Sequence, residues 1–249
     1  MEERQHTTVV AKTNIRAAIM VDGAFYRKRA KYLFGDRSPE VRARELEEFC
    51  RSLLNYDRFE NVYLYRIFYY DCAPSKKKVF HPLTRRTVDL GKSSLYSWMD
   101  TFLKALKEKR KFALRLGELS EDRLNYTLPA DTIKKLCAGT VTIEDLTEES
   151  FELDIEQKGV DMKMGVDIAS VAYKKQVDRI FLITGDSDFV PAAKLARREG
   201  IDVILVPMEQ HVKGSLYEHI DGVRRGRLKN RDNTANEIAN NVVQEVTSE

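Results

Sequence analysis

The chain has 249 residues, a formal net charge of +3 and a hydrophobic content of 43%, which is ordinary for a globular protein with a real core. Its three cysteines are widely spaced and form neither an even disulfide set nor a metal-ligand pair. No segment approaches the roughly 18 apolar residues of a membrane span, and the polar residues 1–16 lack the apolar core of a signal peptide. We therefore expect a soluble, cytoplasmic protein that does not associate with membranes.

The first half of the sequence predicts strands and helices in alternation. Ser38 followed by Pro39 is typical of a helix start, because serine caps and proline suits the first turn. The expected elements are a strand over Ala17–Val21, a helix over Phe25–Leu33, a helix from Ser38 to about Leu54, a strand over Asn61–Tyr70, a helix over Leu95–Lys107 and a strand over Phe112–Leu116. The basic segment from Cys72 to about Ser94 is expected to be a loop.

The second half continues the alternation after an irregular stretch. A short helix is expected over Ala130–Cys137, followed by Glu144–Glu156, which holds seven acidic residues and no basic one. The later elements are a helix from about Val160, a strand over Ile180–Ile183, a helix over Val190–Glu199, a strand over Ile201–Pro207 and a helix over Ser215–Ile220.

This alternation predicts an α/β fold, a mainly parallel open sheet with helices on both faces. We expect a flexible N-terminus over residues 1–16, one domain over residues 17–221 with an irregular insertion at about residues 72–156, and a charged tail over residues 222–249. Basic residues cluster in several places, and the simplest interpretation of each cluster is a solvated surface. The clusters are Arg27–Lys31, Lys76–Lys78 with Arg85 and Arg86, Lys104–Lys111 and Arg224–Arg231.

Acidic residues follow two of the predicted strands. Asp22 ends the first strand, and Asp186 and Asp188 follow Ile180–Ile183. In an open α/β sheet the carboxyl ends of the strands are where ligands bind, and the three acids converge if these two strands are neighbours at a switch point. Carboxylates held close together are unfavourable unless a cation lies between them, so this pattern predicts a metal site.

Two more acids lie on the helix that begins near Val160. Helical spacing places Asp167 on one stripe with Val160, Met164 and Val171, so Asp167 falls on the face that should be buried. A carboxylate there needs a partner, either the metal site or a buried arginine or lysine. Asp161 lies in the first turn, where an acid also benefits from the helix dipole.

The remaining motifs leave a carboxylate site as the main candidate. The sequence has no Gly-x-Gly-x-x-Gly, Walker or Gly-x-Ser-x-Gly motif, and its four histidines form no metal-binding pair. A site made only of carboxylates suits Mg²⁺ or Mn²⁺. Such ions activate water and neutralise phosphate charge.

Three motifs in this order resemble the NYN domain, specifically its LabA-like bacterial branch. They are Asp22-Gly23 after a strand, Lys158-Gly-Val-Asp161 with Asp167, and Thr184-Gly-Asp186-Ser-Asp188-Phe189. The resemblance covers about residues 17–220 and is weak over 72–156. It implies a fold similar to PIN nucleases and an acidic site made of Asp22, Asp161, Asp167, Asp186 and Asp188. Many relatives carry an asparagine shortly after the first aspartate, where this chain has Ala24, Phe25 and Tyr26.

The favoured hypothesis is a Mg²⁺- or Mn²⁺-dependent nuclease that hydrolyses RNA. Its five catalytic aspartates are those named above, of which Asp22, Asp167, Asp186 and Asp188 would hold metal, and Lys158, Thr184 and Ser187 would contact phosphate. A second hypothesis is an RNA-binding or regulatory module with little catalysis, whose insertion or tail docks a protein partner or a second copy. A third, a phosphomonoesterase, is disfavoured because no second acid follows Asp22 at the spacing that a general acid needs.

Overall fold

The computed structural model describes residues 13–55, 60–211 and 214–226. The predicted flexibility of residues 1–12 and most of the predicted charged tail lie outside these residues. Within them, no helix is long and apolar enough to cross a membrane.

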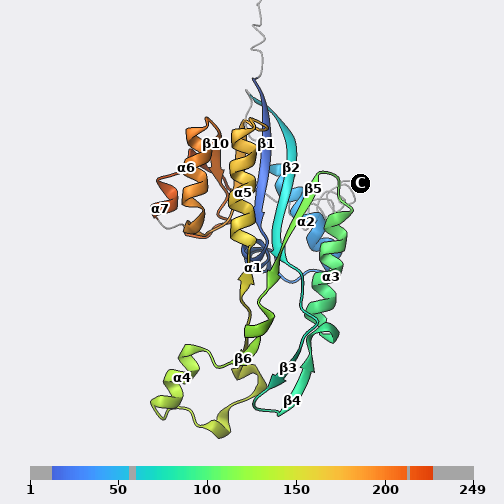
Figure 1. Ribbon diagram of the computed structural model, residues 1–249, viewed down its shortest axis with the longest axis vertical. Coiled ribbons are helices and arrows are strands. Elements are labelled where there is room, and N and C mark those ends of the chain that lie inside the picture. Colours follow the sequence, from blue (N-terminus) through green and yellow to red (C-terminus); the bar gives the residue numbers. More distant parts are fainter. Residues whose placement is uncertain (1–12, 56–59, 212–213, 227–249) are drawn as a thin grey trace, which may run out of the picture.

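A seven-stranded sheet forms the centre of the molecule (Figure 1). Its order is β11-β10-β9-β1-β2-β5-β8, and every pair is parallel except β5–β8. The strands are β1 (Thr13–Asp22), β2 (Glu60–Cys72), β5 (Phe112–Leu119), β8 (Gln157–Lys158), β9 (Arg179–Ile183), β10 (Asp202–Leu205) and β11 (Gly222–Val223). The predicted fold class, an α/β fold with a mainly parallel open sheet, is confirmed.

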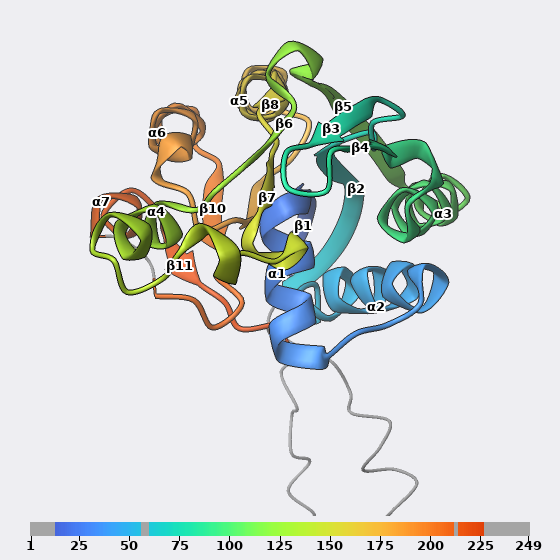
Figure 2. The same cartoon turned by 90° about the horizontal axis from the view of Figure 1, so that it is seen from below.

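Helices cover both faces of this sheet, because alternate residues of its central strands point to opposite sides. Ile19 and Val21 of β1 pack toward the first group of helices, whereas Ala18 and Met20 pack toward the second. Figure 2 shows the two layers with the sheet between them. The first group is α1 (Gly23–Phe34), α2 (Pro39–Ser52) and α3 (Ser94–Lys107), and the second is α5 (Val160–Tyr173), α6 (Val190–Arg198) and α7 (Gly214–Tyr217).

The strand order reverses at β1, which lies between β2 and β9. From β1 the chain builds the sheet outward through β2 and β5, and later through β9 and β10 on the other side. Val21 pairs with Ile183 at the carboxyl end of both strands. The predicted neighbour relation between these two strands is therefore confirmed, and the fold has its switch point where the acidic residues were expected.

The sheet includes residues from both sides of the predicted domain, which was expected to cover residues 17–221. β1 begins at Thr13, four residues before the expected strand, and the Arg16 amide donates to Asp178 Oδ2 over 2.7 Å. At the other end, Gly222 and Val223 pair with β10 inside the segment that was expected to be tail. Pairing with a neighbouring strand stabilises these short polar segments, and composition alone does not reveal it.

The predicted insertion is shorter than expected, because α3 and β5 belong to the main body. Phe102 and Leu106 of α3 are fully buried, and β5 pairs with β2 from Phe112 to Gly117. Only residues 73–92 and 120–156 project from the carboxyl end of the sheet, and we call these two segments the arm (Figure 1). Its elements are β3 (Lys78–His81), β4 (Arg86–Asp89), β6 (Asn125–Thr127), α4 (Ala130–Cys137), β7 (Glu152–Asp154) and the 3₁₀ turns Leu90–Lys92, Glu121–Arg123, Ile143–Asp145 and Glu148–Ser150.

The arm has a small core of its own. β3 and β4 form an antiparallel hairpin where a loop was expected. His81 is 3% exposed, and its ring lies 4.5 Å from that of Tyr126 and 5.1 Å from that of Phe151, centroid to centroid. The hairpin therefore packs on the second arm segment, which explains how strands of four residues persist outside the main sheet.

Candidate functional site

Asp22 occupies the junction between β1 and α1. Its Oδ1 accepts a hydrogen bond from the Phe25 amide at 3.0 Å, which caps α1, and its Oδ2 accepts from Thr184 Oγ1 at 3.2 Å. The pKa of Asp22 is raised. Burial is the largest cause, the charges of Asp161 and Asp186 add to it, and these two hydrogen bonds act in the opposite direction. A recessed carboxylate thus sits in the field of two other acids.

The turn after β9 brings two more carboxylates to the same edge. Thr184 links this turn to β1, since its hydroxyl donates to Asp22 and accepts from the Asp186 amide at 3.1 Å. Asp186 Oδ1 in turn accepts from the Asp188 amide at 3.0 Å, and both aspartate side chains are exposed. Thr184 itself is fully buried, so it positions the acids, and the expectation that it contacts a phosphate directly is corrected.

Asp161 completes a group of four neighbouring acids. It lies in the first turn of α5, which starts after Gly159, a residue with φ of 77°. Partial burial raises the pKa of Asp161, and the charges of Asp186 and Asp188 raise it further. In the described part of the chain, no lysine or arginine forms an ion pair with any of the four. Like charges without a counter-charge are the electrostatic condition that favours cation binding.

The chemistry of these donors fits a hard divalent cation, because all of them are carboxylate oxygens. Their present placement does not form a finished coordination sphere. Among the described residues, no three aspartate, glutamate, histidine or cysteine side chains lie close enough to hold one ion. The side chains of Asp161, Asp186 and Asp188 are exposed, so rotation about their χ angles is sterically open.

Asp167 does not share this group, which corrects the expectation of one pocket containing Asp22, Asp167, Asp186 and Asp188. Its Oδ2 accepts from Arg115 Nε at 2.8 Å and from the Tyr70 hydroxyl at 3.0 Å. Asp167 comes six positions after Asp161, and six positions correspond to a rise of about 9 Å along the helix. The predicted inward-facing carboxylate therefore has a partner, but that partner is an arginine from β5.

The family model described as NYN domain matches residues 104–223, which include Asp161, Asp186 and Asp188 and leave Asp22 outside. This segment, just under half of the chain, is similar to the NYN domain.

Two individual proteins are also similar to this chain. An 81-residue segment is 32% identical to the uncharacterized protein MJ0482 of Methanocaldococcus jannaschii, which is 32% of this chain and 34% of the relative. The match thus spans about a third of that relative's length. The crystal structure of VPA0982, a protein of unknown function from Vibrio parahaemolyticus, aligns with a TM-score of 0.45 and 12% identity, over 85% of this chain and 92% of the other.

The pairing of Asp167 with Arg115 leads to a first prediction. Replacing Asp167 with asparagine removes a charged acceptor from Arg115 and Tyr70, so we expect a loss of about 1–2 kcal/mol in the free energy of unfolding. The partly exposed Arg115 (38%) can regain water, which limits the loss. Denaturant unfolding measures it. If Asp167 were a metal ligand, the variant would instead keep its stability and lose its response to Mn²⁺.

Two features at this edge carried no clear sequence signal. The turn after β10 places Met208 and Glu209 at positive φ (47° and 63°), and Arg29 fixes it by donating from Nε and Nη2 to the Met208 carbonyl at 2.9 and 2.8 Å. This turn brings Gln210 against Gly185, where a Cβ would lie 3.0 Å from Gln210 Nε2. Positive φ at two residues other than glycine is unusual, so nothing in the sequence predicts this turn.

Lys158 and Ser187 keep their places as candidate phosphate contacts. Lys158 is exposed in β8, three residues before Asp161. Ser187 lies between Asp186 and Asp188 in the 3₁₀ turn Ser187–Phe189. Both are near the acids along the chain, and their roles stay predictions.

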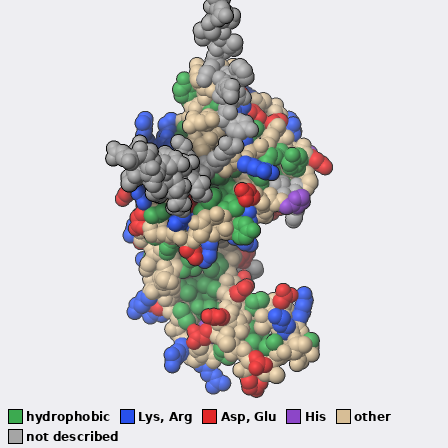
Figure 3. All heavy atoms as spheres, turned by 180° about the vertical axis from the view of Figure 1, so that it is seen from behind, with side chains coloured by type: hydrophobic (Ala, Val, Ile, Leu, Met, Phe, Trp, Pro, Cys, Tyr) green, Lys and Arg blue, Asp and Glu red, His purple; other side chains and the backbone are tan. Residues whose placement is uncertain are grey.

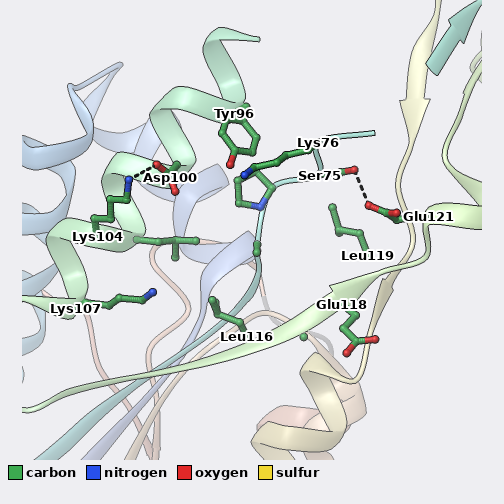
Figure 4. Close-up of a pocket in the computed structure, with 14 residues that line it drawn as sticks. Ser75, Lys76, Tyr96, Asp100, Lys104, Lys107, Leu116, Glu118, Leu119 and Glu121 are labelled. Carbon is green, nitrogen blue, oxygen red and sulfur yellow. Dashed lines mark hydrogen bonds and ion pairs between the residues drawn. The ribbon is translucent and has the colours of Figure 1, made fainter. Parts of the chain in front are cut away.

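A large open cleft lies elsewhere, between α3, β5 and the loop after β2 (Figure 4). It has a volume of about 670 Å³. Its three lysines are balanced by three acids, and Lys104 pairs with Asp100 at 2.7 Å. Because its charges cancel, this cleft lacks the electrostatic character of a polyanion site. The ionisable residues lining it are Lys76, Asp100, Lys104, Lys107, Glu118 and Glu121, together with Tyr96.

Proposed function

We propose that the chain is a ribonuclease of the LabA-like branch of NYN domains, dependent on Mg²⁺ or Mn²⁺ and acting on cytoplasmic RNA. One observation carries the proposal. Carboxylates from β1, α5 and the turn after β9 lie near one another at the switch point, and the charges of their neighbours raise the pKa of Asp22 and of Asp161 without a counter-charge within the described residues. The match to the NYN family supports the same conclusion.

The chain's own residues have distinct roles in this proposal. Asp22, Asp186 and Asp188 hold the metal, and Asp161 completes the ligand set or orients a water. When bound, Mg²⁺ or Mn²⁺ supplies an activated water and neutralises charge on the phosphate. Thr184 keeps Asp22 in place through its hydroxyl. Ser187 and Lys158 contact the phosphate, and Asp167 is left out of the ligand set because of its bonds to Arg115 and Tyr70.

An RNA-binding or regulatory module with little catalysis is the second candidate. It is favoured by the absence of a preformed three-ligand set among the described residues. In that case the arm or the tail would dock a protein partner or a second copy. RNA binding that is indifferent to EDTA, without turnover under any metal, would favour this alternative.

The direct test is cleavage of labelled RNA by the purified chain. Single-stranded and structured RNAs are incubated with Mg²⁺, Mn²⁺ or EDTA, and products are resolved on denaturing gels. We expect products with either metal and none in EDTA. Absence of cleavage with both metals across both RNA types would contradict the proposal.

Thermal unfolding provides a second prediction, independent of turnover. We expect Mn²⁺ at about a hundred times its Kd to stabilise the wild type by about 2.7 kcal/mol, which raises Tm by roughly 5–10 °C for a chain of this size. Asp161→Asn should lose much of this response. In EDTA the same variant should melt slightly higher than the wild type, because one of four repelling charges is gone.

The pH dependence in EDTA checks the same repulsion. The folded chain raises the pKa of Asp22 and of Asp161, so it binds protons more tightly than the unfolded chain does. Wild-type stability should therefore fall as the pH rises from the ordinary aspartate pKa through these raised values. The fall should be smaller in Asp22→Asn, whose amide oxygen can still cap α1. An identical pH profile in both proteins would contradict the assigned repulsion.

A further inference from the structure

The two sides of the β3–β4 hairpin differ in what they contact. Antiparallel pairing puts Phe80 opposite Thr87 and Lys78 opposite Asp89, so these four residues share one side, which we call the hairpin face. The other side carries Val79 and His81, both 3% exposed, and forms the arm core. Phe80, by contrast, is 58% exposed. Lys78, Phe80 and Thr87 of the hairpin face are thus all exposed.

The hairpin is also strongly basic. Between residues 76 and 89 there are five lysines and arginines and one acid, Asp89, which accepts a hydrogen bond from the Gly91 amide. Within the described residues, Lys78, Arg85 and Arg86 make no side-chain hydrogen bond or ion pair. Figure 3 shows basic side chains gathered around this end of the arm. Cations without carboxylate partners are free to meet an external anion.

Apart from Asp89, the acids of the arm lie on its second segment, residues 120–156. All seven acidic residues of the run over residues 144–156 belong to the part that contains the 3₁₀ turns and β7. Charge is therefore separated along the arm, with a basic hairpin and an acidic second segment. A polyanion is attracted to the first and repelled by the second, which restricts it to the hairpin.

We propose that the hairpin face binds single-stranded RNA, with Phe80 stacking on a base, and with Lys78 of the same face and Arg85 of the adjoining turn contacting phosphates. A single exposed phenylalanine is ordinary on a protein surface. Here it lies among unpaired cations, and that combination of an aromatic platform with a basic track is how proteins bind single strands without sequence preference. This proposal rests on the proposed function in one respect, namely that the bound strand is the substrate.

The position of the arm supports that link. It projects from the carboxyl end of the sheet, the end at which β1 passes into α1 and Asp22 lies (Figure 1). Ser75 Oγ donates to Glu121 Oε1 at 3.0 Å, and Lys77 Nζ donates to the Glu121 carbonyl, so the two arm segments are joined at the base. The hairpin and the acids therefore lie at the same end of the sheet.

Binding of a labelled 12-nucleotide single-stranded RNA to the full chain tests the stacking role. Fluorescence anisotropy in EDTA keeps the RNA intact whether or not the chain is a nuclease. We expect Phe80→Ala to weaken binding about tenfold, since stacking on an aromatic side chain contributes that much per base, and Phe80→Trp to restore it. Tyr173→Ala, which removes a comparably exposed aromatic (62%) from α5, should change Kd less than twofold.

The salt dependence of the same binding tests the phosphate contacts. Removing Lys78 and Arg85 together, each to alanine, should reduce the slope of log K against log salt by about 1.4, or about 0.7 for each phosphate that is no longer neutralised. The control replaces Lys134 and Lys135 of α4, which lie on the acidic segment of the arm and carry the same total charge. That control should leave the slope unchanged. Thermal melts of all variants confirm folding.

The outcomes separate this proposal from the proposed function. If both hairpin variants bind RNA with the affinity and the salt slope of the wild type, the hairpin proposal is overturned, even if the chain cleaves RNA. An equal loss of affinity for duplex RNA in Phe80→Ala would also overturn it, because paired bases are not free to stack on a side chain. Weakened single-strand binding in both variants, in a chain that cleaves nothing with either metal, would sustain the hairpin site and reject the nuclease.

Discussion

Replacing Asp186 with asparagine is expected to lower the rate of RNA cleavage by at least about 10³-fold. Metal-assisted charge stabilisation is worth several kcal/mol in a phosphoryl transition state, and each 1.36 kcal/mol is a factor of ten in rate. Asp186 lies at the centre of the acidic group, since its charge raises the pKa of both Asp22 and Asp161. Its loss should therefore weaken metal binding more than the loss of a peripheral acid.

Asp186→Asn removes the negative charge while keeping the hydrogen bond that shapes the turn. Asp186 Oδ1 accepts from the Asp188 amide, and the carbonyl oxygen of an asparagine accepts the same bond. The turn after β9 should persist, and the melting temperature in EDTA should match or exceed that of the wild type. Single-turnover cleavage of labelled RNA with saturating Mn²⁺ gives the rate. A rate within about threefold of the wild type would remove Asp186 from the site.

A matched control changes the same chemical group far from the edge. Asp36 is 81% exposed in the connection between α1 and α2 and pairs with Lys31 at 3.1 Å. Asp36→Asn alters the net charge as Asp186→Asn does, so it reports any general effect of charge on RNA binding. We expect its cleavage rate to be unchanged. Combining Asp186→Asn with Asp188→Asn should cost little more than the first change alone, because ligands of one ion act as a unit.

The sequence was sufficient to predict the switch point. Ala17–Val21 and Ile180–Ile183 are short apolar runs that end in acids, and a parallel sheet places such ends at one edge. Helical spacing placed Asp161 only in the first turn of α5, and the resemblance to the NYN domain assigned it to the acidic site. The prediction of the switch point needed only two kinds of information. The apolar runs are a local property of the sequence, and the order of the strands is a property of the fold topology.

Asp167 shows where this reasoning stops. Helical periodicity correctly placed its side chain toward the sheet and correctly required a partner. The choice between a metal and a buried cation depended on Arg115, which is 52 positions earlier and comes from β5. A pairing over that separation follows from the register of β5 on β2, and a single sequence contains no signal for register between distant strands.

The β3–β4 hairpin within the arm was missed for a different reason. β3 and β4 have four residues each, and the exposed residues Lys78 and Phe80 alternate with Val79 and His81 over too short a window for the period to stand out. Their stability comes from Tyr126 and Phe151 on the other segment. Short strands stabilised by tertiary contacts are predicted as loops when only local sequence is used.

Gly23→Ala is expected to lower the free energy of unfolding by about 3 kcal/mol, the upper end of the usual range for overpacking. A Cβ on Gly23 would lie 2.4 Å from Asp71 Oδ2, 2.6 Å from the Tyr69 hydroxyl and 2.6 Å from the Tyr70 carbonyl. None of these atoms is free to move. Asp71 is 1% exposed and is held by an ion pair with Arg27 and by the Tyr69 hydroxyl at 2.8 Å.

This clash gives a physical reason for the glycine that follows Asp22. α1 begins at Gly23 directly against β2, so its first residue approaches the Tyr70 backbone more closely than a side chain allows. Alanine would push the start of α1 away from β2 and move Asp22, the cap of that helix, with it. Activity should therefore fall even at temperatures where the variant is fully folded, whereas a purely global destabilisation would leave the rate of the folded fraction unchanged.

Gly165→Ala is the matched control, and its effect should have the opposite sign. Gly165 lies within α5, and a Cβ there would meet nothing within 4 Å. Alanine is a better helix former than glycine and restricts the unfolded chain, so a gain of about 0.5–1 kcal/mol is expected. Urea unfolding of both variants measures the pair. Equal and small effects at the two positions would show that the Asp22–Gly23 junction tolerates a side chain, and that the tight packing of α1 on β2 does not fix the position of the first acid.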